Sequence, residues 1–140
     1  MLEFGQKLSL VLHAGLVVYL QGDLGAGKTT LVRGILRGLG HTGKVKSPTY
    51  TLVEVYNVLK FPLYHFDLYR FKSPMEWEDG GFSEHCNTHS LCLMEWPERA
   101  LPLLPPPDLR IRIAEQGEGR QIFLTGESRQ GVALLTLHAA

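Results

Sequence analysis

The chain has 140 residues, of which 44% are hydrophobic and 20% charged, an ordinary balance for one globular domain, here expected over residues 1–140. Its 14 basic and 14 acidic residues cancel, so a nucleic-acid partner would have to meet a local basic patch rather than a global positive field. No apolar run approaches bilayer length, no signal-peptide pattern opens the chain and two cysteines cannot form a disulfide scaffold, which favours a cytoplasmic protein with no membrane contact.

The first part of the chain predicts a helix, a strand, a loop and a second helix. Residues 2–13 carry apolar side chains at helical spacing. Residues 16–20 form a continuous apolar run, which is typical of a strand buried on both faces of a sheet. After a loop at 22–27, apolar residues recur at i, i+4 and i+8 from 28 to 39, as in an amphipathic helix.

The loop between this strand and helix carries a phosphate-binding motif. Residues 22–29 match the pattern G-x-x-x-x-G-K-[ST] at every fixed position, and a chance match in this composition is roughly one in a hundred or less. Glycines let backbone N–H groups approach phosphate oxygens, and the helix adds the positive end of its dipole. In such a cradle Lys28 reaches the β- and γ-phosphates, and the Thr29 hydroxyl is placed to bind Mg²⁺. The expected nucleotide-binding residues here are Gly22, Asp23, Leu24, Gly25, Ala26, Gly27, Lys28, Thr29 and Thr30.

The middle of the chain predicts a loop, a strand pair and a short helix. Proline makes residues 45–51 a loop rather than a helix. Residues 52–56 and 63–66 are strand-like, and the turn between them can join them as a hairpin. Ser73 is expected to cap a short helix that begins at Pro74.

The last part of the chain predicts strands on either side of a proline-rich connector. Residues 91–94 form another buried-strand run, and residues 101–107 are expected to be extended. Residues 109–113 alternate apolar and basic side chains, as in a half-buried strand. The remaining expected elements are a turn at 116–119 and strands at 121–125 and 132–137.

Two acidic residues follow strand-like runs, and either could serve the phosphate site. P-loop enzymes need an acid at a strand end to hold Mg²⁺ and orient the reaction, and α/β sheets bind ligands at the carboxyl ends of strands. Glu95 ranks first for the metal because its strand is the more completely apolar, and Asp67 is the second candidate. Either acid could instead cap a turn or pair with an arginine.

Two further features have both a functional and an ordinary interpretation. Thr49 lies in the loop after the P-loop helix, where nucleotide switches place a hydroxyl that senses the γ-phosphate, although a plain turn threonine fits equally. Arg110, Arg112 and Arg120 could form a basic strip, although such arginines more often line a solvated strand face.

Several blocks of the sequence, taken in order from about Leu8 to Arg120, resemble the TsaE (YjeE) family. They are the P-loop with Thr30, the segment 45–54 with its Ser-Pro-Thr-Tyr, the segment 64–70 with its His-Phe-Asp-Leu-Tyr-Arg, and the pairs Glu95-Trp96 and Leu104-Pro105. The P-loop alone is shared by many families, but the second and third blocks together are specific.

The resemblance implies an ATPase required for N6-threonylcarbamoyladenosine at position 37 of tRNAs that read codons beginning with A. It implies that the protein joins the TsaD–TsaB transferase pair and hydrolyses ATP to renew it between turnovers, meeting tRNA only through that pair. It assigns Mg²⁺ to Thr29 and Glu95, catalysis to Lys28, Thr49, Asp67, Glu95 and Trp96, and contact with the nucleotide base to Arg120.

The sequence predicts a three-layer α/β P-loop domain with a partly parallel central sheet and antiparallel C-terminal strands. Two other functions use the same cradle. A small-molecule kinase needs an arginine-bearing lid and an acceptor pocket, for which 140 residues leave little room. A nucleotide-gated adaptor would bind ATP without turnover. A GTPase is disfavoured because the sequence has no Asn-Lys-x-Asp tetrapeptide.

Overall fold

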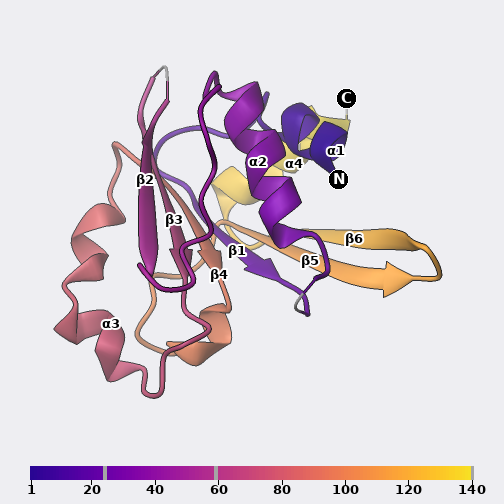
Figure 1. The fold of residues 1–140 in the computed structure, drawn as a ribbon. Helices are drawn as coiled ribbons and strands as arrows, with labels where there is room; N and C mark the ends of the chain where they lie inside the picture. Colours follow the sequence, from indigo (N-terminus) through magenta and orange to yellow (C-terminus); the bar gives the residue numbers. More distant parts are fainter. Residues whose placement is uncertain (24, 59, 140) are drawn as a thin grey trace.

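A computed structural model describes every residue of the chain except Leu24, Leu59 and Ala140. Its six strands form one sheet in the order β2-β3-β4-β1-β5-β6 (Figure 1). The elements in chain order are α1 (Leu2–Leu8), β1 (Val17–Gln21), α2 (Lys28–Gly38), β2 (Val53–Asn57), β3 (Pro62–Asp67), α3 (Met75–Asp79), the 3₁₀ turn η1 (Phe82–His85), β4 (Leu91–Glu95), the 3₁₀ turn η2 (Pro97–Arg99), β5 (Leu109–Gln116), β6 (Gly119–Gly126) and α4 (Arg129–Ala139).

The middle of the sheet is parallel and both edges are antiparallel. Strands β3, β4, β1 and β5 run in one direction, so the carboxyl ends of the strands that precede the P-loop and the two candidate acids meet at one edge. The hairpin partners β2 and β6 close the two sides in the opposite direction. The expected partly parallel sheet with antiparallel C-terminal strands is therefore confirmed.

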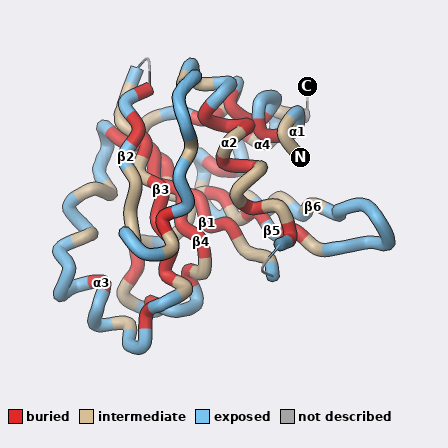
Figure 2. Tube along the Cα trace, viewed as in Figure 1, coloured by how far each residue is buried: buried red, intermediate tan, exposed pale blue. Residues whose placement is uncertain are grey.

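Helices and turns cover the two faces of the sheet unequally. Helices α1, α2 and α4 pack on one face around an apolar cluster that includes Leu20, Leu31 and Ile35. Helix α3 and the 3₁₀ turn η1 cover part of the other face, where Trp77 of α3 packs against Phe66 of β3. Buried residues run through the central strands in Figure 2, and every residue of β4 is buried. The long apolar runs of the sequence thus lie where both faces are covered.

Helices α1 and α2 cross so closely that only glycine fits at the contact. A Cβ atom on Gly34 would lie 2.3 Å from the carbonyl oxygen of Leu2, and one on Gly5 would lie 2.6 Å from that of Leu31. This crossing fixes α2, and with it the P-loop at its amino end.

The strand expected at residues 132–137 is wrong, because this segment lies in helix α4. The Ser128 hydroxyl accepts a hydrogen bond from the N–H of Gly131 and so caps the helix start. Gly131 and Leu134 are buried and Leu135 and His138 are half-buried, which is a helical spacing rather than an alternation.

Three smaller expectations also need correction. The first helix ends at Leu8 instead of 13, since the Ser9 hydroxyl donates to the carbonyl oxygen of Gln6 and the chain turns. The connector at 101–107 is not extended throughout, because its first residues form turns and Leu104 is buried. Helix α3 begins one residue later than expected, with Pro74 as its cap. No helix in the described part of the chain has the length and apolar character that crossing a bilayer requires.

Candidate functional site

The P-loop leaves the carboxyl end of β1 and enters α2, as the motif requires. Gly22 passes so close to β5 that a Cβ atom there would lie 2.8 Å from the carbonyl oxygen of Ile113. Gly25 and Gly27 have φ values of 80° and 111°, which side chains other than glycine rarely adopt. The glycines are thus needed for the course of the loop, while Leu24 lies outside the described residues.

The amino end of α2 offers backbone donors to the loop. Among the described residues, no hydrogen-bond acceptor is found for the amide N–H of Thr29 or of Thr30. Such N–H groups and the positive end of the helix dipole together favour an anion, and phosphate is the usual one. The arrangement therefore fits a nucleotide phosphate.

Lys28 is buried at the first position of α2 and its ammonium group lies over the loop. Its Nζ donates to the carbonyl oxygen of Gly22 at 2.5 Å, lies 4.0 Å from Oε1 of Glu95, and sits 3.9 Å from the ring centroid of Trp96. Burial lowers the pKa of Lys28, and the carboxylates of Glu95 and Asp67 oppose that shift. A phosphate oxygen is a stronger partner for this cation than a carbonyl oxygen is.

The two candidate acids are neighbours on adjacent parallel strands. Asp67 ends β3 and Glu95 ends β4, and the sheet register pairs them directly. Oε2 of Glu95 lies 2.6 Å from Nε2 of His65. Oδ1 of Asp67 accepts from the N–H of Tyr69 at 3.0 Å. Burial raises the pKa of Asp67, the Tyr69 N–H opposes that shift, and the Glu95 carboxylate adds to it.

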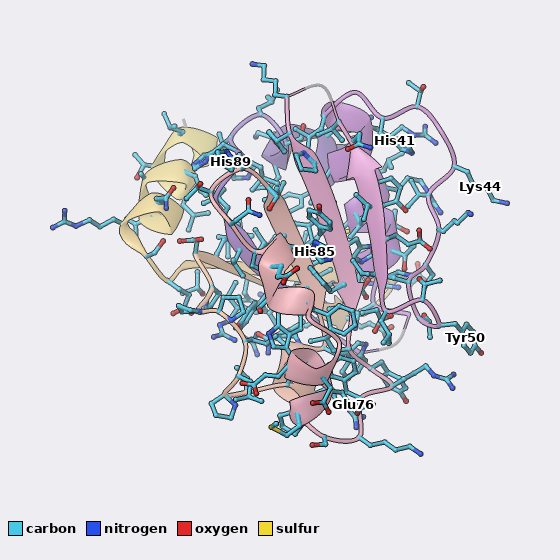
Figure 3. All side chains as sticks on the ribbon, turned by 90° about the vertical axis from the view of Figure 1, so that its left-hand side faces the viewer. His41, Lys44, Tyr50, Glu76, His85 and His89 are labelled. Carbon is cyan, nitrogen blue, oxygen red and sulfur yellow. The ribbon has the colours of Figure 1, made fainter. Side chains whose placement is uncertain are left out.

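The loop before β2 brings Thr49 into the same site. The Thr49 hydroxyl donates to Oδ2 of Asp67 at 3.2 Å, and the Ser47 hydroxyl lies 2.8 Å from the Thr49 hydroxyl. Its neighbour Tyr50 points out into solvent (Figure 3), where Arg70 stacks over the ring at 4.6 Å. The loop thus joins the site to an exposed surface.

A cavity of about 320 Å³ unites these groups. It is lined by Gly25, Gly27, Lys28, Thr29, Thr30, Ser47, Thr49, Asp67, Glu95 and Trp96. The structure therefore gathers in one place the phosphate cradle, Thr49 and both acids, although they come from four separate stretches of sequence.

Trp96 holds an uncommon backbone conformation at the rim of this cavity. Its φ is 58°, in the left-handed region, and its ring meets Tyr69 edge-on at 4.9 Å between centroids. Left-handed backbone in a bulky residue costs of order 1–3 kcal/mol and clusters at functional sites. The conformation turns the indole over Lys28.

Arg120 contacts the backbone of the P-loop and does not line the 320 Å³ cavity. Its Nε donates to the carbonyl oxygen of Ala26 at 2.9 Å. Arg110 and Arg112 do not form a free basic strip, because Arg110 pairs with Glu127 at 3.0 Å and Arg112 lies over the ring of Phe123. These arginines hold the β5–β6 hairpin and the loop together.

The described residues contain no group of three or more His, Cys, Asp or Glu side chains that could hold a metal ion unaided. Mg²⁺ usually takes one or two protein oxygens and completes its shell with water and substrate phosphates. The Thr29 hydroxyl and the Glu95 carboxylate beside a phosphate cradle fit that pattern, with Asp67 next to them.

Sequence reasoning missed two residues of the site, Ser47 and His65. Ser47 lies next to the proline that defined the loop, and only the fold turns its hydroxyl toward Thr49. His65 occupies an inward position of β3 where an apolar residue is expected, and that polar break in a buried strand was the available signal.

Comparisons with known proteins agree with this fold and identify the family. A family model described as threonylcarbamoyl adenosine biosynthesis protein TsaE matches residues 1–122. The tRNA threonylcarbamoyladenosine biosynthesis protein TsaE of Haemophilus influenzae is 48% identical, over 97% of this chain and 89% of that protein. Its namesake from Bacillus subtilis is 44% identical, over 79% of this chain and 70% of that protein. A crystal structure of Bacillus subtilis YdiB matches with a TM-score of 0.82 at 33% identity, covering 99% of this chain and 86% of that one.

Proposed function

The chain belongs to the TsaE family, and from that premise we propose that it is a Mg²⁺-dependent ATPase that renews the TsaD–TsaB transferase during tRNA modification. Proteins of this family function in the biosynthesis of threonylcarbamoyladenosine in tRNA. The observation that supports the ATPase part is the single cavity in which Lys28, Thr49, Asp67 and Glu95 meet at the P-loop.

Four residues of the cavity and the backbone amides of the P-loop have defined roles in this proposal. Lys28 and the amide groups of the loop neutralise the β- and γ-phosphates. Thr29 and Glu95 hold Mg²⁺, which supplies further positive charge to the phosphate oxygens. Asp67 orients the attacking water, and burial raises its pKa, which makes it a stronger base than an exposed aspartate.

A partner requirement follows from the charges that line the cavity. Lys28 is the only cation among its lining residues in the described part of the chain. P-loop hydrolysis that lacks an internal arginine commonly waits for a partner to order a switch or supply one, a step worth ~10³–10⁵-fold. Tyr50 and Arg70 form an exposed aromatic–cation pair beside Thr49, where a partner can order the switch loop.

We therefore expect slow ATP hydrolysis by the isolated protein, well below the ~10 s⁻¹ typical of enzymes, and a rise when TsaD and TsaB are added. Thr49→Ala and Trp96→Ala should reduce that rise while leaving ATP binding intact, because neither side chain supplies the phosphate cradle. Steady-state ATPase assays with purified components measure both effects.

The same assay separates the competing functions. ATP binding without any turnover, with or without the partners, would favour a nucleotide-gated adaptor. Phosphorylation of a metabolite in the absence of TsaD and TsaB would favour a kinase. An unchanged rate at saturating TsaD–TsaB, with no complex seen by size exclusion in ATP, would contradict the proposal.

A further inference from the structure

His65 is a fully buried polar residue at a position where the sheet otherwise places leucine. On the α2 side of β3 the inward residues are Leu63, His65 and Asp67, and on β4 the register partners are Leu91, Leu93 and Glu95. His65 is 0% exposed, and it lies one residue pair inward from the two acids. A buried imidazole costs free energy unless its nitrogens are hydrogen-bonded, so packing alone would favour leucine here.

The one polar contact of this imidazole in the described residues is Glu95. Nε2 of His65 lies 2.6 Å from Oε2 of Glu95, and Nδ1 has no hydrogen-bond partner among the described residues. A carboxylate oxygen only accepts, so Nε2 carries the hydrogen and donates a hydrogen bond to Oε2. Within the described residues, the side chain of His65 therefore hydrogen-bonds only to one oxygen of the Glu95 carboxylate.

This contact gives the two oxygens of the Glu95 carboxylate different partners. With Oε2 held from beneath by His65, Oε1 is the oxygen that faces the cradle, 4.0 Å from Nζ of Lys28. Without that donor, the Glu95 carboxylate could rotate about its last bond, or turn both oxygens toward the ammonium group. Side chains that orient a metal-binding carboxylate from behind typically change metal affinity 10–100-fold when removed.

We propose that His65 is a positioning residue that fixes the Glu95 carboxylate so that Oε1 is presented to the Mg²⁺ of a bound Mg²⁺–nucleotide. The inference rests on the proposed function, since it gives Glu95 the metal. It separates His65 from an ordinary core histidine, whose removal would change stability but not the response of nucleotide binding to Mg²⁺.

Calorimetric titration with the β,γ-imido analogue of ATP, in EDTA and in excess Mg²⁺, tests the proposal. His65→Leu should bind the analogue in EDTA with an affinity within about twofold of wild type. The factor by which Mg²⁺ increases that affinity should be about 10–100-fold smaller than in wild type. His65→Gln can place an amide N–H near the position of Nε2 and should retain most of it. The side chain in His65→Asn is too short to reach Glu95, so this variant should show the same loss of Mg²⁺ response. It therefore serves as the second variant if His65→Leu folds poorly.

A double-mutant cycle with Glu95→Gln shows whether His65 acts through Glu95. In the Glu95→Gln background, His65→Leu should cause no further loss of Mg²⁺ tightening. Wild-type Mg²⁺ tightening in both His65→Leu and His65→Asn, or fully additive losses in the cycle, would overturn the inference alone. A wild-type protein whose affinity for the analogue does not respond to Mg²⁺ would overturn the proposed function as well.

Discussion

At the scale of single residues, one buried cation faces two buried carboxylates. Lys28, Asp67 and Glu95 are 5%, 6% and 4% exposed, so their charges are poorly screened by water. The cluster carries more negative than positive charge where the P-loop is expected to bind an anion. A bound Mg²⁺ would correct that balance, which is why the residues favour a Mg²⁺–nucleotide over free phosphate.

Lys28→Ala should remove nearly all affinity for ATP, at least about 100-fold, because it deletes the one cation among the residues that line the cavity in the described chain. Isothermal titration calorimetry measures the loss. Arg33→Ala, more than one turn further along α2, is the matched control and should bind ATP like wild type. Wild-type affinity for ATP in Lys28→Ala would contradict the assignment of the P-loop as the phosphate-binding site.

Asp67→Asn should stabilise the protein in a pH-dependent way. At pH values well below the ordinary aspartate pKa of about 4, the carboxyl is protonated in both the folded and unfolded states and makes no difference. As the pH rises, the unfolded state ionises first because burial raises the folded-state pKa of Asp67, so wild-type stability falls until that raised pKa is passed. Asparagine stays neutral, and its amide oxygen can still accept from the N–H of Tyr69.

Thermal unfolding from pH 3 to pH 8 measures this difference. The Tm of Asp67→Asn should equal that of wild type near pH 3 and exceed it by a few degrees at pH 7. A variant that is less stable than wild type at pH 7, or a Tm difference that is constant with pH, would contradict the buried-carboxyl interpretation.

Most residues of the site could be predicted from the sequence, because their motifs specify local geometry. The P-loop spacing defines Lys28 and Thr29, and an acid that ends an apolar run marks the strand ends at Asp67 and Glu95. His65 could not be assigned in this way, because its role depends on a neighbouring strand.

At the scale of elements, helix α2 is placed by its contact with α1. Gly34→Ala adds a methyl group that would lie 2.3 Å from the carbonyl oxygen of Leu2, so the helices must separate. The gain in helix propensity is about 1 kcal/mol, and overpacking costs about 1–3 kcal/mol, so we expect a net loss of stability.

Urea unfolding of Gly34→Ala measures that loss. Arg33→Ala, on the same helix, is the control and should change the unfolding free energy by less than about 0.5 kcal/mol. A Gly34→Ala variant more stable than wild type would mean that the two helices do not cross as closely as the structure places them.

Periodicity predicted the central elements well and the C-terminal helix badly. Strands β1 and β4 are continuous apolar runs up to their last residues, Gln21 and Glu95, which distinguishes them from amphipathic helices. The run from Val132 to Leu137 is equally apolar, and its helical state depends on the Ser128 cap and on packing against β6, of which only the cap residue is visible in the sequence.

At the scale of the whole molecule, strand order makes the site. Strand β4 lies directly between β1 and β3, so the P-loop after β1 has Glu95 as its neighbour and Asp67 one strand further. Sequence alone does not contain this order, since β4 enters the sheet between two strands that precede it in the chain. Ligands in open α/β sheets bind at the carboxyl ends of such strands.

Whether this protein renews the TsaD–TsaB transferase is measured by the yield of threonylcarbamoyl-tRNA per molecule of TsaD, with and without this protein and ATP. The yield per TsaD should be many-fold higher with this protein than without it, provided that ATP is present and Lys28 is intact. Addition of the Lys28→Ala variant should restore no further turnovers. An equal yield per TsaD with wild type, with Lys28→Ala and with no added protein would contradict the claim.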